Sequence, residues 1–186
     1  MEEDFVKWKV SVAVKKLLEK DAHLLRVDIN ERSICHRLAA YLQEQFYDWN
    51  VDCEYNRNAA DTKSLHAAKE LGIPIDSVQS DDTDSITVFP DIIVHKRGTS
   101  NNLLVVEVKK TTNQALDGFD IGKLCRFKRQ LHYSYALFLR FTTGQDDIGV
   151  FREVWIEKRD CDNAEPEFHQ EIELRRRRHE ARRRGA

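Results

Sequence analysis

Two carboxylates and an amine stand at the ends of two apolar runs in the middle of the chain. Asp91 opens a run that ends at His95, and Glu107 and Lys109 close a second run that begins at Leu103. The polar, glycine-containing residues between the runs predict a β-hairpin. Because side chains at i and i+2 share a face of a strand, Glu107 and Lys109 should point the same way. Two carboxylates beside a lysine suit Mg²⁺-assisted or Mn²⁺-assisted phosphodiester hydrolysis.

The order of these residues also resembles a known signature. Pro90-Asp91, then 15 residues, then Glu107-Val108-Lys109 is similar to the active-site motif of the PD-(D/E)xK nuclease superfamily, which has the restriction-endonuclease-like fold. The resemblance implies that Asp91, Glu107 and the main-chain carbonyl of Val108 hold Mg²⁺ or Mn²⁺, and that Lys109 acts on the attacking water or the phosphate. The alternative is an ordinary hairpin whose acid and lysine face solvent at a strand end.

A glutamate upstream offers a third carboxylate. The sequence from Asn30 to Phe46 has apolar residues at helical spacing, and Asn30 is suited to cap a helix. Glu31 lies one turn before Ile34 and Cys35, so it shares the buried stripe. Many members of the superfamily carry a glutamate on the helix before the sheet, so the resemblance makes Glu31 a further catalytic residue and metal ligand. The other explanation is that Glu31 only complements the helix dipole.

The remaining periodicity predicts an α/β fold. A helix is expected over 121–132, and buried strands over 135–141 and 150–156. With the upstream helix and three earlier strands, the order is that of the superfamily's αβββαβ core, a mixed central sheet flanked by helices, plus one further strand. We expect an N-terminal helical segment over 1–29, the nuclease core over 30–157 with an insertion over 56–86, and an arginine-rich helix or tail over 158–186. Within the insertion, 63–71 has a helical pattern.

Composition predicts a cytoplasmic enzyme. The 186 residues are 41% hydrophobic and 33% charged, which suits one domain with a well-solvated surface. No apolar run is long enough to cross a membrane, and the first residues are acidic where a signal peptide would be basic. The four cysteines show no C-x-x-C pair, so we expect reduced thiols.

The net charge of −2 conceals an uneven distribution. Residues 175–186 hold seven arginines and one glutamate, a balance of +6, so the other 174 residues carry −8. The arginine run could bind phosphates or could serve solubility alone. An acidic body that binds nucleic acid must concentrate its positive charge near the site. The residues expected to contact nucleic acid are Lys110, Lys123, Arg126 and Arg129.

The sequence therefore predicts a Mg²⁺-dependent phosphodiesterase, most readily an endonuclease that acts on DNA. We expect no membrane partner, and the protein could form a homodimer or bind a partner protein. The sequence contains no recognisable DNA-recognition motif, such as a helix-turn-helix or a zinc finger. This fits a catalytic subunit whose specificity comes from a partner protein. The alternative from another class is a catalytically silent nucleic-acid-binding or protein-interaction module on the same fold. A basic groove around the site would favour the nuclease, whereas an acidic or covered site would favour the interaction module.

Overall fold

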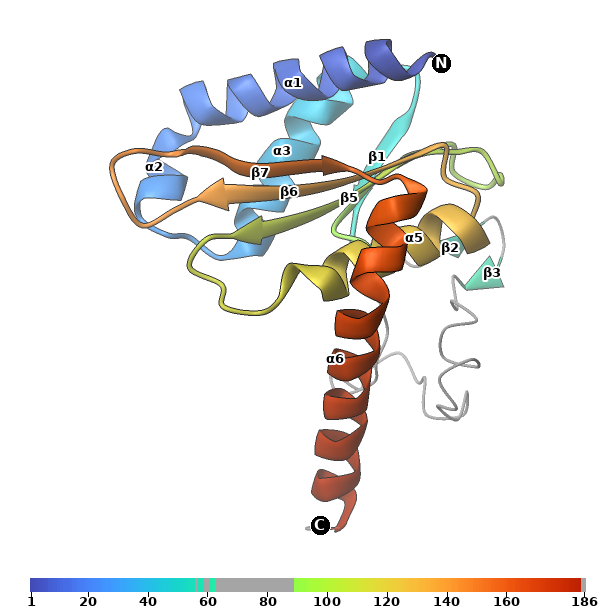
Figure 1. Ribbon diagram of the computed structural model, residues 1–186. Helices are drawn as coiled ribbons and strands as arrows, with labels where there is room; N and C mark the ends of the chain where they lie inside the picture. Colours follow the sequence, from blue (N-terminus) through green and yellow to red (C-terminus); the bar gives the residue numbers. More distant parts are fainter. Residues whose placement is uncertain (56, 59–60, 63–88, 185–186) are drawn as a thin grey trace.

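A five-stranded sheet forms the centre of the molecule (Figure 1). The computed structural model describes residues 1–55, 57–58, 61–62 and 89–184. The strands follow the order β1-β4-β5-β6-β7 across the sheet, and β2 and β3 form a separate pair. The bounds are β1 (Asn50–Cys53), β2 (Arg57–Asn58), β3 (Asp61–Thr62), β4 (Ile92–His95), β5 (Asn102–Lys110), β6 (Tyr135–Thr142) and β7 (Gly149–Trp155).

The sheet is mixed. Its only parallel pair within the described residues is β5 with β6, and the other neighbours run antiparallel. Parallel neighbours need a crossover connection, which here is α5 (Asp117–Gln130). The predicted hairpin is present as β4 and β5. The α/β class and the mixed sheet flanked by helices are confirmed.

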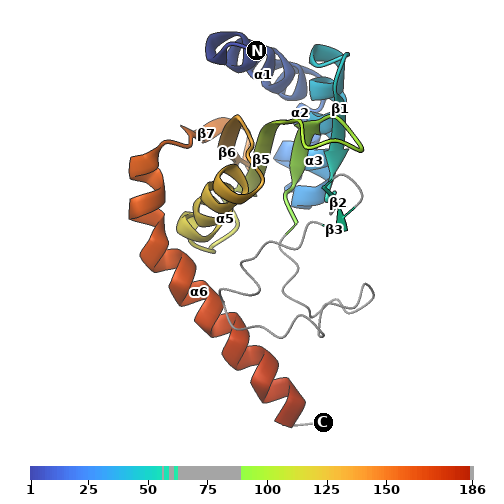
Figure 2. The same cartoon turned by 90° about the vertical axis from the view of Figure 1, so that its right-hand side faces the viewer.

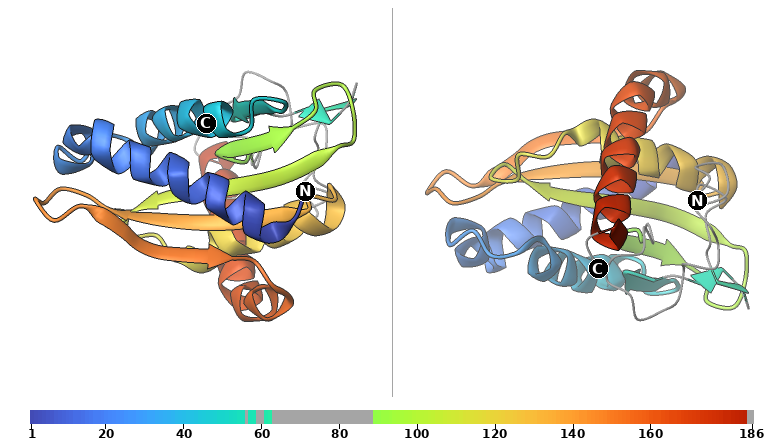
Figure 3. Two further views of the ribbon diagram at one scale, coloured as in Figure 1. Left: turned by 90° about the horizontal axis from the view of Figure 1, so that it is seen from above. Right: turned by 90° about the horizontal axis from the view of Figure 1, so that it is seen from below.

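Helices cover both faces of the sheet. α1 (Glu3–Lys20) and α3 (Glu31–Gln45), with the short α2 (Ala22–Arg26) between them, pack on one face. α5 and the first part of α6 (Lys158–Arg184) pack on the other, as Figures 2 and 3 show. β5 contributes side chains to the cores on both faces, because successive side chains of a strand point to opposite faces of the sheet.

The alternation on β5 decides where the charged side chains go. Leu104 and Val106 belong to the core under α1 and α3, and Val105 belongs to the core under α5. By the same period of two, Glu107 and Lys109 lie on the α5 face. Both are charged residues inside an apolar layer, so that layer must supply their partners.

Several predicted elements are present with small shifts. Asn30 caps α3, accepting a hydrogen bond from the Ser33 amide, and the helix expected over 121–132 runs from 117 to 130. Of the two alternatives for the C-terminus, the structure shows a helix, which extends away from the sheet in Figure 1. The predicted insertion over 56–86, with its helical pattern over 63–71, falls almost entirely outside the described residues.

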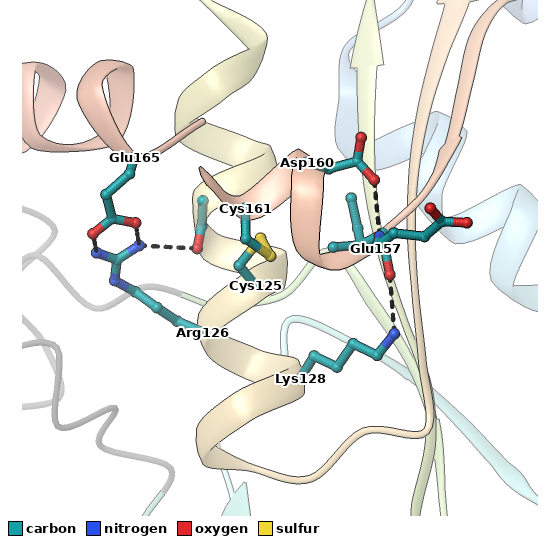
Figure 4. Close-up of a disulfide and its surroundings, with 9 residues drawn as sticks. Cys125, Arg126, Lys128, Glu157, Asp160, Cys161 and Glu165 are labelled. Atoms are coloured by element: carbon teal, nitrogen blue, oxygen red, sulfur yellow. Dashed lines mark hydrogen bonds and ion pairs between the residues drawn. A yellow bond between two sulfur atoms is a disulfide. The ribbon is translucent and has the colours of Figure 1, made fainter. Parts of the chain in front are cut away.

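The expectation of four reduced cysteines is wrong. Cys125 of α5 and Cys161 of α6 form a disulfide, shown in Figure 4, while Cys35 and Cys53 are free thiols. Spacing along the chain gives no sign of this pair because it is the packing of α6 on α5 that brings the two Cα atoms to 5.6 Å. The prediction of a cytoplasmic location loses the support it took from reduced thiols, since disulfides persist mainly in oxidising compartments.

Among the described residues, no helix combines the length and the apolar character that a membrane span requires.

The disulfide should stabilise the fold. It closes a loop with a sequence separation of 36 residues, so Cys161→Ser should lower the free energy of unfolding by about 4 kcal/mol, because the unfolded chain gains entropy. Urea denaturation under oxidising conditions measures the difference. The control is Cys53→Ser, which removes an exposed free thiol and should change little. Equal stabilities for wild type and Cys161→Ser would contradict the disulfide.

Candidate functional site

A cavity of about 280 Å³ opens beside the C-terminal end of β5, and α5 and α6 supply much of its wall. All four residues predicted to be catalytic, Glu31, Asp91, Glu107 and Lys109, line it, and Val108 lines it too. They come from α3, from the residue before β4 and from β5. The fold thus brings into one cavity side chains that lie far apart in the sequence.

Asp91 reaches the cavity through strand register. Ile92 pairs with Val106 in the antiparallel β4–β5 ladder, so the preceding residue, Asp91, lies opposite Glu107 on the same face. The Val108 amide donates a hydrogen bond of 2.7 Å to Asp91 Oδ2. Burial raises the pKa of Asp91, although the nearby Lys123 and the Val108 amide oppose the rise. The two carboxylates of the predicted motif are therefore neighbours.

Glu107 is the most buried acid of the site, with 2% of the residue exposed. Its Oε2 accepts a hydrogen bond of 2.6 Å from Lys123 Nζ, whereas Oε1 accepts none from the residues that the structure describes. Burial raises the pKa of Glu107 well above its ordinary value, against the attraction of Lys123. A buried carboxylate oxygen without a partner is unfavourable. This oxygen, next to the Asp91 carboxylate, fits the hard oxygen ligands that Mg²⁺ and Mn²⁺ prefer.

Lys109 is equally buried, but its ammonium does not contact Glu107. Nζ donates to the Leu116 carbonyl and to Asp120 Oδ2, each at 2.8 Å, in and next to the first turns of α5. Asp120 is a residue that the sequence analysis did not assign to the site. Burial opposes the ionisation of Asp120, but Lys123 and Lys109 outweigh it and lower the pKa of Asp120. Its only sequence signal is the i,i+3 spacing to Lys123 on a predicted helix.

Glu31 ties α3 to the end of β5. Its Oε1 accepts hydrogen bonds from the Lys110 amide at 3.0 Å and from Asn113 Nδ2 at 2.9 Å. Glu31 thus does more than complement the dipole of its own helix, because it receives a main-chain amide of the strand that carries Glu107. The contact holds the start of α3 against the cavity.

The four side chains expected to contact nucleic acid do not gather on one surface. Lys110 pairs with Asp28 at 3.0 Å, and Lys123 lies inside the cavity. Arg126 is 5% exposed, pairs with Glu165 and lies over the ring of Phe168 (Figure 4 shows the ion pair). Arg129 is exposed. Two of the four are therefore buried, and a third is engaged on another face.

The cavity is acidic. Its lining includes six carboxylates and two amines, namely Glu31, Asp91, Glu107, Asp120, Glu167, Glu171, Lys109 and Lys123. The two glutamates of α6 had no sequence signal that linked them to the site. Among the described residues, no three acidic, histidine or cysteine side chains converge closely enough to hold a metal ion as they stand. In this arrangement the two lysine ammonium groups pair with Glu107 and Asp120.

The chain matches no protein-family model, no curated protein sequence and no solved structure.

The raised pKa of Glu107 predicts a pH effect. The folded protein holds the Glu107 proton to higher pH than the unfolded chain, so this group makes the fold less stable as pH rises from 4.5 through the folded pKa. Glu107→Gln cannot ionise and removes that term. In EDTA, the Tm of Glu107→Gln relative to wild type should therefore increase with pH over this interval. Thermal unfolding at a series of pH values measures it, and a difference independent of pH would contradict the assignment.

Proposed function

We propose that the chain is a metal-dependent nuclease that hydrolyses phosphodiester bonds, most readily within DNA. The observation that carries the proposal is the cavity in which Asp91, Glu107 and Lys109 meet at the end of β5. The order of α3, β1, β4, β5, α5 and β6 further supports it, because it is the order that the resemblance to the PD-(D/E)xK superfamily and its restriction-endonuclease-like core implies.

The residues of the cavity would have different roles in hydrolysis. Asp91, Glu107 and the Val108 carbonyl, with Glu31, would hold Mg²⁺ or Mn²⁺. When bound, the ion supplies neutralisation of the phosphate charge and a water of lowered pKa. Lys109 would orient the attacking water or the phosphate. An ammonium carries three protons, and two are donated to Leu116 and Asp120. The third is available for this purpose, with Asp117 Oδ1 at 3.7 Å as its other neighbour.

A second candidate function has an observation in its favour. α6 places Glu167 and Glu171 in the cavity wall, and Glu167 also accepts a hydrogen bond of 2.8 Å from the Gly118 amide. These carboxylates would repel a phosphodiester that approached without a cation. An acidic, partly covered cavity suits the catalytically silent interaction module better than a basic groove would. The cleavage assay below separates the two candidates.

Positive charge for nucleic acid must then come from elsewhere. Arg126 and Lys110 are already paired within the fold. The arginine run continues along α6 to Arg184, and a homodimer or a partner protein would supply more. This favours weak sequence preference or a partner that provides specificity.

Cleavage assays test the proposal. The protein is incubated with plasmid, linear duplex DNA, single-stranded DNA and RNA in Mg²⁺, Mn²⁺ or EDTA. Cleavage should require the metal, and Lys109→Met, which keeps the volume of the side chain, should reduce it at least about 10²-fold, because a donor to the transition state is lost.

The matched control is Lys110→Met. Lys110 directly follows Lys109 in the chain, but its amine pairs with Asp28 outside the cavity, so this variant should keep most of the activity. Circular dichroism verifies that both variants fold. If wild type cleaves none of these substrates with either metal, the interaction module is the better account. Equal activities of the two variants would remove Lys109 from the mechanism.

A further inference from the structure

Lys123 occupies an unusual position for a lysine. It lies on α5, its side chain is 11% exposed, and its Nζ lies 2.6 Å from Glu107 Oε2 and 3.2 Å from Asp120 Oδ1. Burying an ammonium is unfavourable unless carboxylates surround it. Lys123 satisfies that condition only because it points into the acidic cavity.

The two lysines of the cavity have different partners. Lys109 contacts Asp120 and the Leu116 carbonyl and lies 3.7 Å from Asp117, whereas Lys123 contacts Asp120 and Glu107. Among the described residues, Lys123 forms the one ion pair with Glu107. The carboxylate that the proposed function assigns to a divalent cation is thus already engaged by a monovalent one from α5.

The two cations cannot share Glu107 on equal terms. A divalent ion binds carboxylate oxygens at about 2.0–2.6 Å, and an ammonium within hydrogen-bond reach of the same carboxylate repels it strongly in a buried site. Glu107 Oε1 accepts no hydrogen bond within the described part of the chain, which leaves a direction of approach. Full coordination still requires Lys123 to weaken or leave its contact with Oε2.

We propose that Lys123 is a built-in counter-cation that holds Glu107 in place before a divalent ion arrives and then yields Glu107 to that ion. Asp120 is the partner that receives the ammonium when it moves, since it already lies at 3.2 Å. This inference rests on the proposed function, because it presumes that Glu107 is a ligand. It assigns Lys123 to positioning the ligand, and removes it from contact with nucleic acid.

The competing explanation is a permanent ion pair between α5 and β5 that stays intact when metal binds. The two accounts differ in the metal-bound state. A counter-cation that leaves Glu107 contributes to stability only without metal, whereas a permanent pair contributes equally with and without it. By linkage, the first case also means that removing the amine must tighten metal binding.

Calorimetric titration with Mn²⁺ separates these accounts. Wild type, Lys123→Met and Lys109→Met are compared. Both variants remove one buried amine that pairs with Asp120, but only the first removes the contact with Glu107. Lys123→Met should bind Mn²⁺ about tenfold more tightly than wild type and clearly more tightly than Lys109→Met. Equal gains for the two variants would reduce the effect to general electrostatics and overturn the inference.

Thermal unfolding provides a second test, in which the Tm is measured and no enzymatic activity is needed. Lys123→Met should have a lower Tm than wild type in EDTA, and saturating Mn²⁺ should abolish the difference. A difference that persists in Mn²⁺ would establish a permanent ion pair. Lys123→Gln, which keeps a neutral donor near Glu107, replaces the Met variant if that variant does not fold, and the same outcomes apply.

The outcomes also separate this inference from the proposed function. If wild type binds Mn²⁺ and Lys123→Met binds it no more tightly than Lys109→Met, the inference fails alone. If neither wild type nor any variant binds Mn²⁺, both fail. If only Lys123→Met binds it, Lys123 does not yield Glu107 to the ion, which overturns the inference and favours the interaction module.

Discussion

The burial of Glu107 under α5 is the constraint on which the rest of the site depends. A carboxylate inside an apolar layer requires a nearby positive charge, and Lys123 supplies it from α5. That lysine in turn needs Asp120, and Asp120 also receives Lys109. The charged groups therefore form one network, and within the described residues breaking the Lys123–Glu107 pair leaves Glu107 buried without an ion-pair partner. Buried titratable groups with perturbed pKa values are enriched at functional sites, although structural ion-pair networks perturb pKa values as well.

The same strand end organises the elements around the network. Main-chain amides of β5 donate to side chains from two other places in the chain, Val108 to Asp91 and Lys110 to Glu31. Each carboxylate thereby satisfies a backbone group while its side chain stays beside the cavity. The disulfide then fixes the start of α6 to α5, which helps to hold the acidic side chains of α6 in the cavity wall.

Local rules were enough to predict much of this from the sequence. The period of two placed Glu107 and Lys109 on one face, and the capping rule placed Asn30 at the start of α3. Long-range packing was not predictable in this way. Nothing local distinguishes Lys123 and Arg126, which are buried, from Arg129 on the same helix, which is exposed. The Cys125–Cys161 pair likewise depends on how α6 packs on α5.

The central claim is that the carboxylates at the end of β5 form a divalent-cation site. Crystals of the protein grown with Mn²⁺ test it most directly, because the anomalous scattering of manganese locates the ion independently of any assumed ligand. We expect a peak within about 2.0–2.6 Å of oxygens from both Asp91 and Glu107, with Lys123 Nζ withdrawn from Glu107. A well-ordered cavity at saturating Mn²⁺ that shows no peak, with Lys123 still paired to Glu107, would contradict it.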